Sequence, residues 1–366
     1  MRTSIELLIK PASGNCNMKC TYCFYADTQK NREVASYGFM SLDVLETIVK
    51  KAIDNSFQHV SLCFQGGEPT LSGLDFYKSL IEIEKKHNNR NIPICHTLQT
   101  NGYVIDDSWA DFFAENKFLI GLSMDGYDTL HDKYRIDKDD KGTHNRLMQN
   151  IEILRKHKVE FNILTVVNAD IAANAKKVYE FYYENNLLYQ QYIPCFNPFG
   201  EENQAYEHTL TPELYAKFLK DLFDCWYKDL KAGKFIYNRY FEGLVGLIKG
   251  YRPESCGMLG FCSDQYVVEA DGSVYPCDFY VLDQFKIGNL TTDSFEQLDA
   301  NRKKSKFVED SAVISSECRQ CKWLMICRGG CRRDREMSEI GKVGHNRYCE
   351  AYKEFFDYAY ERLNSF

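Results

Sequence analysis

The first two thirds of the chain alternate short apolar runs with longer stretches of helical periodicity. This alternation predicts a parallel sheet whose strands are joined by right-handed crossover helices. Six such units would make an α/β fold, a partial (β/α)6 barrel of parallel strands that is open on one side. The predicted strands are Glu6–Lys10, Val60–Phe64, Pro93–Gln99, Leu119–Met124, Glu160–Val167 and Tyr189–Pro194, and the predicted helices lie near Leu42–Asn55, Gly73–His87, Ser108–Asn116, Thr143–Lys156 and Ala172–Asn185.

Polar, cysteine- or glycine-rich segments follow five of the predicted strands. They are the cysteine loop after the first strand, Gln65–Pro69 after the second, Gln99–Gly102 after the third, Ser123–Gly126 after the fourth and Cys195–Pro198 after the sixth. In parallel α/β barrels the C-terminal ends of the strands form the active face, so these segments are expected to meet there. Ordinary turn chemistry accounts for some of them equally well.

The cysteine loop has the spacing C-x3-C-x2-C and contains Cys16, Cys20 and Cys23. Proteins normally supply one thiolate to each iron of a [4Fe–4S] cluster, and this loop supplies only three. One iron would therefore be open to a small molecule. A zinc knuckle or a group of buried thiols is the alternative. The loop resembles that of the radical S-adenosylmethionine superfamily, in which the open iron binds S-adenosylmethionine and an electron then releases a 5′-deoxyadenosyl radical.

The remainder of the chain differs in character and suggests two further domains. Residues 1–210 are the predicted barrel, and residues 211–250 are a helix-rich connector over Thr211–Leu247. Residues 251–366 are rich in cysteine and contain Asp271-Gly272, a two-residue hairpin signal between Gln265–Ala270 and Ser273–Asp278. The last segment, Cys349–Leu363, has the pattern of a closing amphipathic helix.

Eight cysteines lie in this C-terminal part, the number that two fully ligated [4Fe–4S] clusters need. Zinc sites with four thiolates have similar spacing, and this part alone does not separate the two metals. The pattern resembles the SPASM domain, which carries two auxiliary [4Fe–4S] clusters. The resemblance implies that one cluster is held by Cys256, Cys262, Cys277 and Cys331, and the other by Cys318, Cys321, Cys327 and Cys349.

Composition narrows the class of protein further. The net charge of −7 gives no basic footprint, so nucleic acid is not an expected partner. No apolar run is long enough to span a membrane, and no export signal is evident, so a cytoplasmic protein with reduced thiols is expected. Four further cysteines fall mostly in apolar patterns and are predicted to be core thiols: Cys63, Cys95, Cys195 and Cys225.

The whole chain resembles an anaerobic sulfatase-maturating enzyme. The segments that carry the resemblance are CNMKCTYCFY, FQGGEPTL, LQTNG, LSMDG, YPCDFYVL and CRQCKWLMICRGGCRR. The resemblance implies oxidation of a cysteine or serine of a sulfatase polypeptide to Cα-formylglycine, with three [4Fe–4S] clusters and flavodoxin or ferredoxin as electron donor. It assigns Asp278, next to Cys277, as the proton acceptor; the alternative for Asp278 is a hairpin-end residue that accepts backbone hydrogen bonds.

The same resemblance implies the residues that contact the cofactor. Glu68 could receive the ammonium group of S-adenosylmethionine, and Arg135 suits its carboxylate. Tyr25 would border the peptide. The positions matched to contacts with S-adenosylmethionine are Tyr22, Gly67, Ser123, Arg135 and Phe196.

Two other functions are compatible with these motifs. A maturase that forms thioether or carbon–carbon crosslinks in a ribosomally made peptide uses the same domains, although many such enzymes carry a leader-binding domain and only fifteen residues precede Cys16 here. A non-catalytic, metal-stabilised interaction protein would bind S-adenosylmethionine weakly and would not cleave it.

Overall fold

The computed structural model describes residues 2–201, 204–336 and 340–366, which form two compact units. Each unit collects separate stretches of the chain. The first unit comprises Met1–Ser123, Arg135–Phe161 and Asp264–Phe307, and the second comprises Met124–Tyr134, Asn162–Ser263 and Val308–Phe366. The division into residues 1–210, 211–250 and 251–366 rests on composition and stays a prediction.

The first unit is built on a sheet with the strand order β10-β9-β8-β1-β2-β3-β4. Neighbouring strands from β8 to β4 are parallel, whereas the hairpin partners β8 and β9 are antiparallel and β10 is antiparallel to β9. The hairpin predicted at Asp271-Gly272 is confirmed, and its first strand pairs with β1. The strands are β1 (Arg2–Ile9), β2 (Ser56–Phe64), β3 (Ile94–Thr100), β4 (Leu119–Ser123), β8 (Tyr266–Val268), β9 (Ser273–Tyr275) and β10 (Gly288–Asn289).

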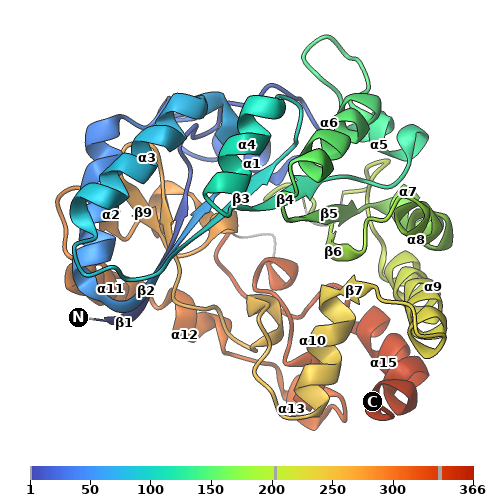
Figure 1. The fold of residues 1–366 in the computed structure, drawn as a ribbon. Helices are drawn as coiled ribbons and strands as arrows, with labels where there is room; N and C mark the ends of the chain where they lie inside the picture. The colour runs from blue at the N-terminus through green and yellow to red at the C-terminus, as the bar shows by residue number, and fades with distance from the viewer. Residues whose placement is uncertain (1, 202–203, 337–339) are drawn as a thin grey trace. The chain divides into compact units, whose positions relative to one another are not determined.

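Helices of the first unit cover this sheet because each has one apolar face. In α2 the buried side chains Leu45, Ile48, Val49 and Ala52 recur at helical spacing, and the helix packs on β1 and β2 (Figure 1). Its first turn is capped by Ser41, whose hydroxyl accepts from the Val44 N–H. The helices are α1 (Phe24–Lys30), α2 (Leu42–Asn55), α3 (Leu74–His87), α4 (Asp107–Glu115), α6 (His144–Lys156) and α11 (Phe295–Ser305), with single turns η1 (Pro69–Ser72), η3 (Asp278–Tyr280) and η4 (Asp283–Phe285).

The second unit contains three parallel strands and the two longest helices of the described residues, α9 and α15. Helix α9 packs against α15, as the apolar patterns of both segments favour. The strands are β5 (Phe161–Val167), β6 (Tyr189–Pro194) and β7 (Tyr237–Asn238). The helices are α5 (Asp128–Tyr134), α7 (Ala169–Ala173), α8 (Ala175–Glu184), α9 (Pro212–Lys231), α10 (Arg239–Ile248), α13 (Ser316–Gln320), α14 (Leu324–Cys327) and α15 (Cys349–Asn364), with η2 (Cys256–Met258) and η5 (Arg333–Arg335); α12 (Phe307–Ser311) lies where the chain passes between units.

The α/β class with parallel strands is therefore confirmed, and all six predicted strands are present as β1 to β6. The helix-rich stretch predicted over Thr211–Leu247 is confirmed. It contains α9 and α10, and between them the chain becomes extended and pairs β7 with β6. Among the helices of the described residues, none is both long and apolar enough to cross a membrane.

Candidate active site

The cysteine loop follows β1 directly and ends at the start of α1. Cys23 is the N-terminal cap of that helix, and its N–H donates to the carbonyl of Cys20 at 3.2 Å. The Met18 N–H donates to the Cys16 sulfur at 3.4 Å. Burial raises the pKa of the Cys16 thiol to about 12; Glu68, Cys20 and Cys23 contribute to this rise, and the hydrogen bond from the Met18 N–H opposes it. Cys20 and Cys23 lie close enough to act on the Cys16 thiol, so the loop offers three sulfur donors that fit an iron–sulfur cluster.

A backbone contact holds the loop after β2 against the cysteine loop. The Glu68 N–H donates to the Asn15 carbonyl at 2.7 Å. Gly67 sits beside this contact with φ of 51°, and a Cβ there would come within 2.2 Å of the same carbonyl oxygen. Only glycine fits such a close approach. The contact brings the side chain of Glu68 to the base of the cysteine loop.

The Glu68 carboxylate is 1% exposed and joins the loops that follow β2 and β3. Its Oε1 accepts from the Thr70 N–H at 3.0 Å, from the Thr70 hydroxyl at 2.7 Å and from the Thr100 hydroxyl at 2.7 Å. Its Oε2 accepts only from the Asn101 N–H, at 2.8 Å, among the described residues. A carboxylate has about four acceptor sites, two on each oxygen, so Oε2 keeps room for one more donor. Burial raises the pKa of Glu68, and these hydrogen bonds oppose the rise.

The other positions matched to the cofactor are divided between the two units. Ser123 ends β4, and its hydroxyl accepts from the Gln99 amide at 3.1 Å. Arg135 is buried, with its guanidinium carbon 5.5 Å from the Tyr22 ring centre. These residues all belong to the first unit, as do Gly67 and Glu68, whereas Phe196 is buried in the second.

Asp278 opens the short turn η3 and is 7% exposed. Gln65, at the end of β2, donates its amide to Oδ2 at 2.6 Å. The ammonium group of Lys10, one residue beyond β1, forms an ion pair with Oδ1. Both partners thus come from the C-terminal ends of parallel strands, the edge at which the sequence predicted an active face. Among the described residues, the Asp278 carboxylate accepts a hydrogen bond from the Gln65 side chain and pairs with Lys10, and no backbone donor of a hairpin end reaches it.

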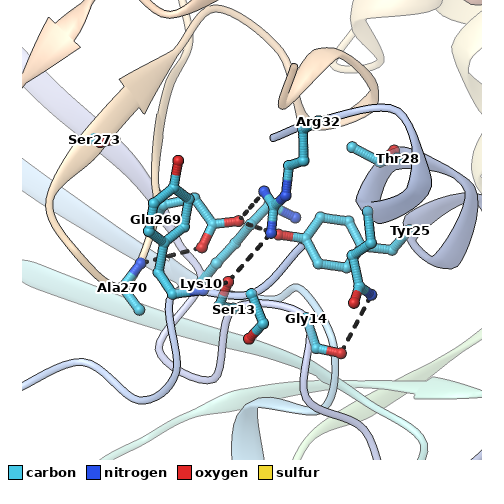
Figure 2. A network of polar contacts seen from close by, with 12 residues as sticks. Lys10, Ser13, Gly14, Tyr25, Thr28, Arg32, Glu269, Ala270 and Ser273 are labelled. Atoms are coloured by element: carbon cyan, nitrogen blue, oxygen red, sulfur yellow. Dashed lines mark hydrogen bonds and ion pairs between the residues drawn. The ribbon is translucent and has the colours of Figure 1, made fainter. Parts of the chain in front are cut away.

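Tyr25 is 3% exposed, and its hydroxyl donates to the carboxylate of Glu269. The same carboxylate oxygen accepts from Arg32 at 2.8 Å (Figure 2). Burial works to raise the pKa of Glu269, but the positive charges of Arg32 and Lys10 outweigh it, and the pKa lies below its ordinary value. Lys10 also lies 4.0 Å from the Tyr25 ring centre, which connects this network to Asp278.

Four of the C-terminal cysteines line one pocket in the second unit: Cys318, Cys321, Cys327 and Cys349. His345 is at its edge, with Nδ1 3.8 Å from the Cys318 sulfur. Burial raises the pKa of Cys327, and the neighbouring Cys318 and Cys321 add to the rise. Converging thiols of this kind fit the second of the two clusters that the resemblance implies.

The other four cluster cysteines are divided between the units. Cys256, Cys262 and Cys331 belong to the second unit, and Cys277 precedes η3 in the first. Burial raises the pKa of Cys331 well above its ordinary value, and Asp334, Cys256 and Cys262 raise it further. Among the four cysteines predicted to be core thiols, Cys195 is buried, Cys63 and Cys225 are partly exposed, and the prediction was wrong for Cys95, which is exposed on β3.

Comparison with known proteins identifies the family. The radical SAM superfamily matches residues 11–180, and an iron–sulfur cluster-binding domain, SPASM, matches residues 260–322. A cysteine-type anaerobic sulfatase-maturating enzyme of Clostridium perfringens is 48% identical over 98% of this chain and 97% of its own. The chain belongs to the anaerobic sulfatase-maturating enzymes.

Two further relatives extend this finding. A serine-type anaerobic sulfatase-maturating enzyme of Bacteroides thetaiotaomicron is 30% identical over 97% of this chain and 89% of its own. A solved structure described as native anSMEcpe with bound AdoMet and Cp18Cys peptide superposes with a TM-score of 0.95, at 46% identity over 99% of this chain and 98% of that one. The enzyme therefore has the radical SAM fold with a C-terminal SPASM domain, and its cofactors are S-adenosylmethionine and iron–sulfur clusters, auxiliary clusters included.

Sequence reasoning missed part of this site. From the sequence, Lys10 is interpreted as the last residue of an apolar strand, and Gln65 is interpreted as part of a glycine-rich turn. The pairing of Arg32 with Glu269 joins residues 237 positions apart, which no local pattern signals. The one sequence feature that could have indicated Lys10 as a site residue is its place at the end of a buried strand, just before the cysteine loop.

Proposed function

We propose that this enzyme oxidises one cysteine of a sulfatase polypeptide to Cα-formylglycine in the cytoplasm. The cysteine preference is supported by the identity of 48% to a cysteine-type relative against 30% to a serine-type one. The fifteen cysteines, eleven of them proposed cluster ligands, favour the cytoplasm, a compartment that keeps thiols reduced. The observation that carries the proposal is the buried Asp278 carboxylate, which Lys10 connects to Tyr25, two residues beyond the last cysteine of the loop.

The proposed cofactor residues follow from the donors and acceptors of the first unit. Cys16, Cys20 and Cys23 would hold the cluster. Glu68 Oε2 has an acceptor site left for the ammonium group of S-adenosylmethionine, and Arg135 offers a guanidinium for its carboxylate. The remaining proposed contacts are those of Tyr22, Gly67, Ser123 and Phe196.

When bound, S-adenosylmethionine and its cluster supply the radical that removes one Cβ hydrogen atom from the target cysteine. To reach the thioaldehyde, the target must then lose the thiol proton and one electron; water converts the thioaldehyde to the aldehyde and releases hydrogen sulfide. Asp278 is the proposed acceptor of the proton. Its neighbour Cys277 would hold an auxiliary cluster with Cys256, Cys262 and Cys331, so that one short segment carries both acceptors.

The second auxiliary cluster would be held by Cys318, Cys321, Cys327 and Cys349, whose shared pocket supports the assignment. Flavodoxin or ferredoxin is the proposed electron donor. Tyr25 is proposed to border the peptide, although its own hydroxyl is already bonded to Glu269.

A peptide with the motif Cys-x-Pro-x-Arg tests the proposal. We expect reduced enzyme with S-adenosylmethionine to convert its cysteine to an aldehyde that reacts with a hydrazine reagent and has the mass of formylglycine. A peptide with alanine at the target position is the control and should not react. A lasting intramolecular crosslink in place of the aldehyde would indicate the crosslinking maturase and refute the proposal.

Asp278→Asn separates the two halves of the reaction. Because hydrogen abstraction precedes loss of the thiol proton, this variant should still form 5′-deoxyadenosine but little aldehyde. A wild-type yield of aldehyde from this variant would show that another group accepts the proton.

A further inference from the structure

Lys10 is a fully buried cation at the reacting end of the first sheet. It follows the last residue of β1, and its side chain is 0% exposed. The chain leaves room for it at Gly66, where a Cβ would come within 2.5 Å of the Lys10 Cγ. Gly66 also has φ of 83°, so glycine is required there for two reasons. The backbone at Gly66 therefore leaves the space that the Lys10 side chain occupies.

The counterion of the Lys10 ammonium group is the Asp278 carboxylate, because the other nearby carboxylate, Glu269, pairs with Arg32. Four charged side chains are buried in this part of the first unit, two of each sign. Arg32 and Glu269 form one pair, with Nη1 and Oε1 2.8 Å apart, and the Tyr25 hydroxyl donates to the same oxygen (Figure 2). Lys10 and Asp278 form the other pair. A buried ammonium group without a counterion is strongly unfavourable, so the second pair holds its geometry firmly.

The Asp278 carboxylate has a partner on each of its oxygens, an ion pair at Oδ1 and a hydrogen bond at Oδ2. Lys10 reaches Oδ1 from the end of β1, and Gln65 reaches Oδ2 from the end of β2. An ion pair and a hydrogen bond from residues that follow two adjacent parallel strands restrain the plane of the carboxylate, which the three-residue turn η3 would not do alone. The centre of the Tyr25 ring lies 4.0 Å from the Lys10 ammonium nitrogen, so the ring limits the movement of that nitrogen.

We propose that Lys10 is a positioning residue of the oxidation, which orients the Asp278 carboxylate toward the target thiol. The inference rests on the proposed function of Asp278 as the proton acceptor. Without the ammonium group the carboxylate rotates about its Cβ–Cγ bond, with Gln65 as its only described side-chain donor. Hydrogen abstraction does not use Asp278, so loss of Lys10 separates the formation of 5′-deoxyadenosine from the formation of aldehyde.

The test compares Lys10→Met with Lys10→Arg and with the control Lys51→Met. Lys51 belongs to the same unit and donates to three backbone carbonyls, far in sequence from Asp278. Lys10→Met should bind the Cys-x-Pro-x-Arg peptide and cleave S-adenosylmethionine within about threefold of wild type, while aldehyde formed per 5′-deoxyadenosine falls by roughly tenfold to a hundredfold. Lys10→Arg keeps the charge and should recover part of this ratio. Lys51→Met should keep the wild-type ratio.

A double-mutant cycle on thermal unfolding of the cluster-loaded protein measures the same pair without turnover. Lys10→Met and Asp278→Asn should each lower the unfolding temperature, and the double variant should lower it by less than the sum, because no unpaired charge remains. Strictly additive shifts, or a wild-type ratio of aldehyde to 5′-deoxyadenosine in Lys10→Met, would overturn the inference. Absence of formylglycine from the wild-type enzyme would instead refute the proposed function, so the two failures are distinguishable.

Discussion

Glu68→Gln should weaken binding of S-adenosylmethionine and leave the fold almost unchanged. An amide that keeps its oxygen at the position of Oε1 retains the two bonds from Thr70 and the bond from Thr100. Its amide nitrogen then takes the place of Oε2, where it faces the Asn101 N–H and cannot accept the cofactor ammonium. The substitution therefore removes the one acceptor site that remains available.

Two effects on the free energy of unfolding oppose each other. Loss of the charge-assisted bond from Asn101 costs about 1.5–3 kcal/mol. Burial, however, raises the pKa of Glu68, so the contribution of this group to stability is full below its unfolded pKa and is lost as pH rises through its folded pKa. At neutral pH the ionised carboxylate is therefore unfavourable, and a neutral amide avoids that cost. We expect a net change below about 1.5 kcal/mol.

In the binding of S-adenosylmethionine, no second effect offsets the loss of the hydrogen bond. Loss of one charge-assisted hydrogen bond to the ammonium group should weaken binding by roughly 10- to 150-fold. Equilibrium dialysis with labelled S-adenosylmethionine measures the affinity, and thermal unfolding measures stability. Glu84→Gln is the control, because the Glu84 carboxylate is also buried and bonded, to His96 at 2.8 Å, in the same unit. Wild-type affinity with a loss of more than about 3 kcal/mol of stability would show that Glu68 only joins two loops.

Three further predictions concern the cysteine loop, the buried Asp334 and the partly buried Lys51. Cys16→Ala should abolish formation of 5′-deoxyadenosine, whereas Cys95→Ala, at an exposed position, should not. Equal yields of 5′-deoxyadenosine from the two variants, measured by chromatography, would refute the cluster assignment. Burial raises the pKa of Asp334 to about 6 from 3.8, so its contribution to stability is lost as pH rises through that range. Asp334→Asn should thus stabilise the protein by up to about 3 kcal/mol at neutral pH and by nothing below about pH 4, and thermal unfolding across pH would contradict this if the gain were constant. Lys51→Met loses three hydrogen bonds to carbonyls and should destabilise the protein by about 1–3 kcal/mol in denaturant unfolding, and an unchanged midpoint would show that solvent replaces them.

The strands were predictable because each is a short apolar run, and the loops after them because polar residues interrupt the pattern. The segment from Gln65 to Pro69 was correctly placed at the end of a strand, beside the cysteine loop. The cysteine spacing indicated the cofactor, since few inorganic groups need three thiolates so close together. These features are local in the chain, and a single sequence displays them directly.

Features that depend on distant pairing were not predictable. Nothing near Lys10 indicates that Asp278 lies against it, because the contact exists only once β8 pairs with β1. The extended stretch at Tyr237–Asn238 is two residues long and carries no strand pattern, so no local signal indicates that β7 pairs with β6 inside the helix-rich segment. Cys95 resembled a core thiol in an apolar run, but its own side chain on β3 is exposed. In each case the deciding neighbour is far away in the sequence.

The pairing of β8 with β1 has a consequence for how the enzyme can be divided. Residues 264–307 complete the sheet that begins at Arg2, so the ribosome must make most of the polypeptide before that sheet has its full set of strands. A fragment truncated after residue 210 would keep the cysteine loop and the pairing of β1 with β2, but the other edge of Leu7–Ile9 would lack β8 and form an open sheet edge that favours self-association. Such a fragment should aggregate unless a peptide spanning the missing hairpin is supplied in trans.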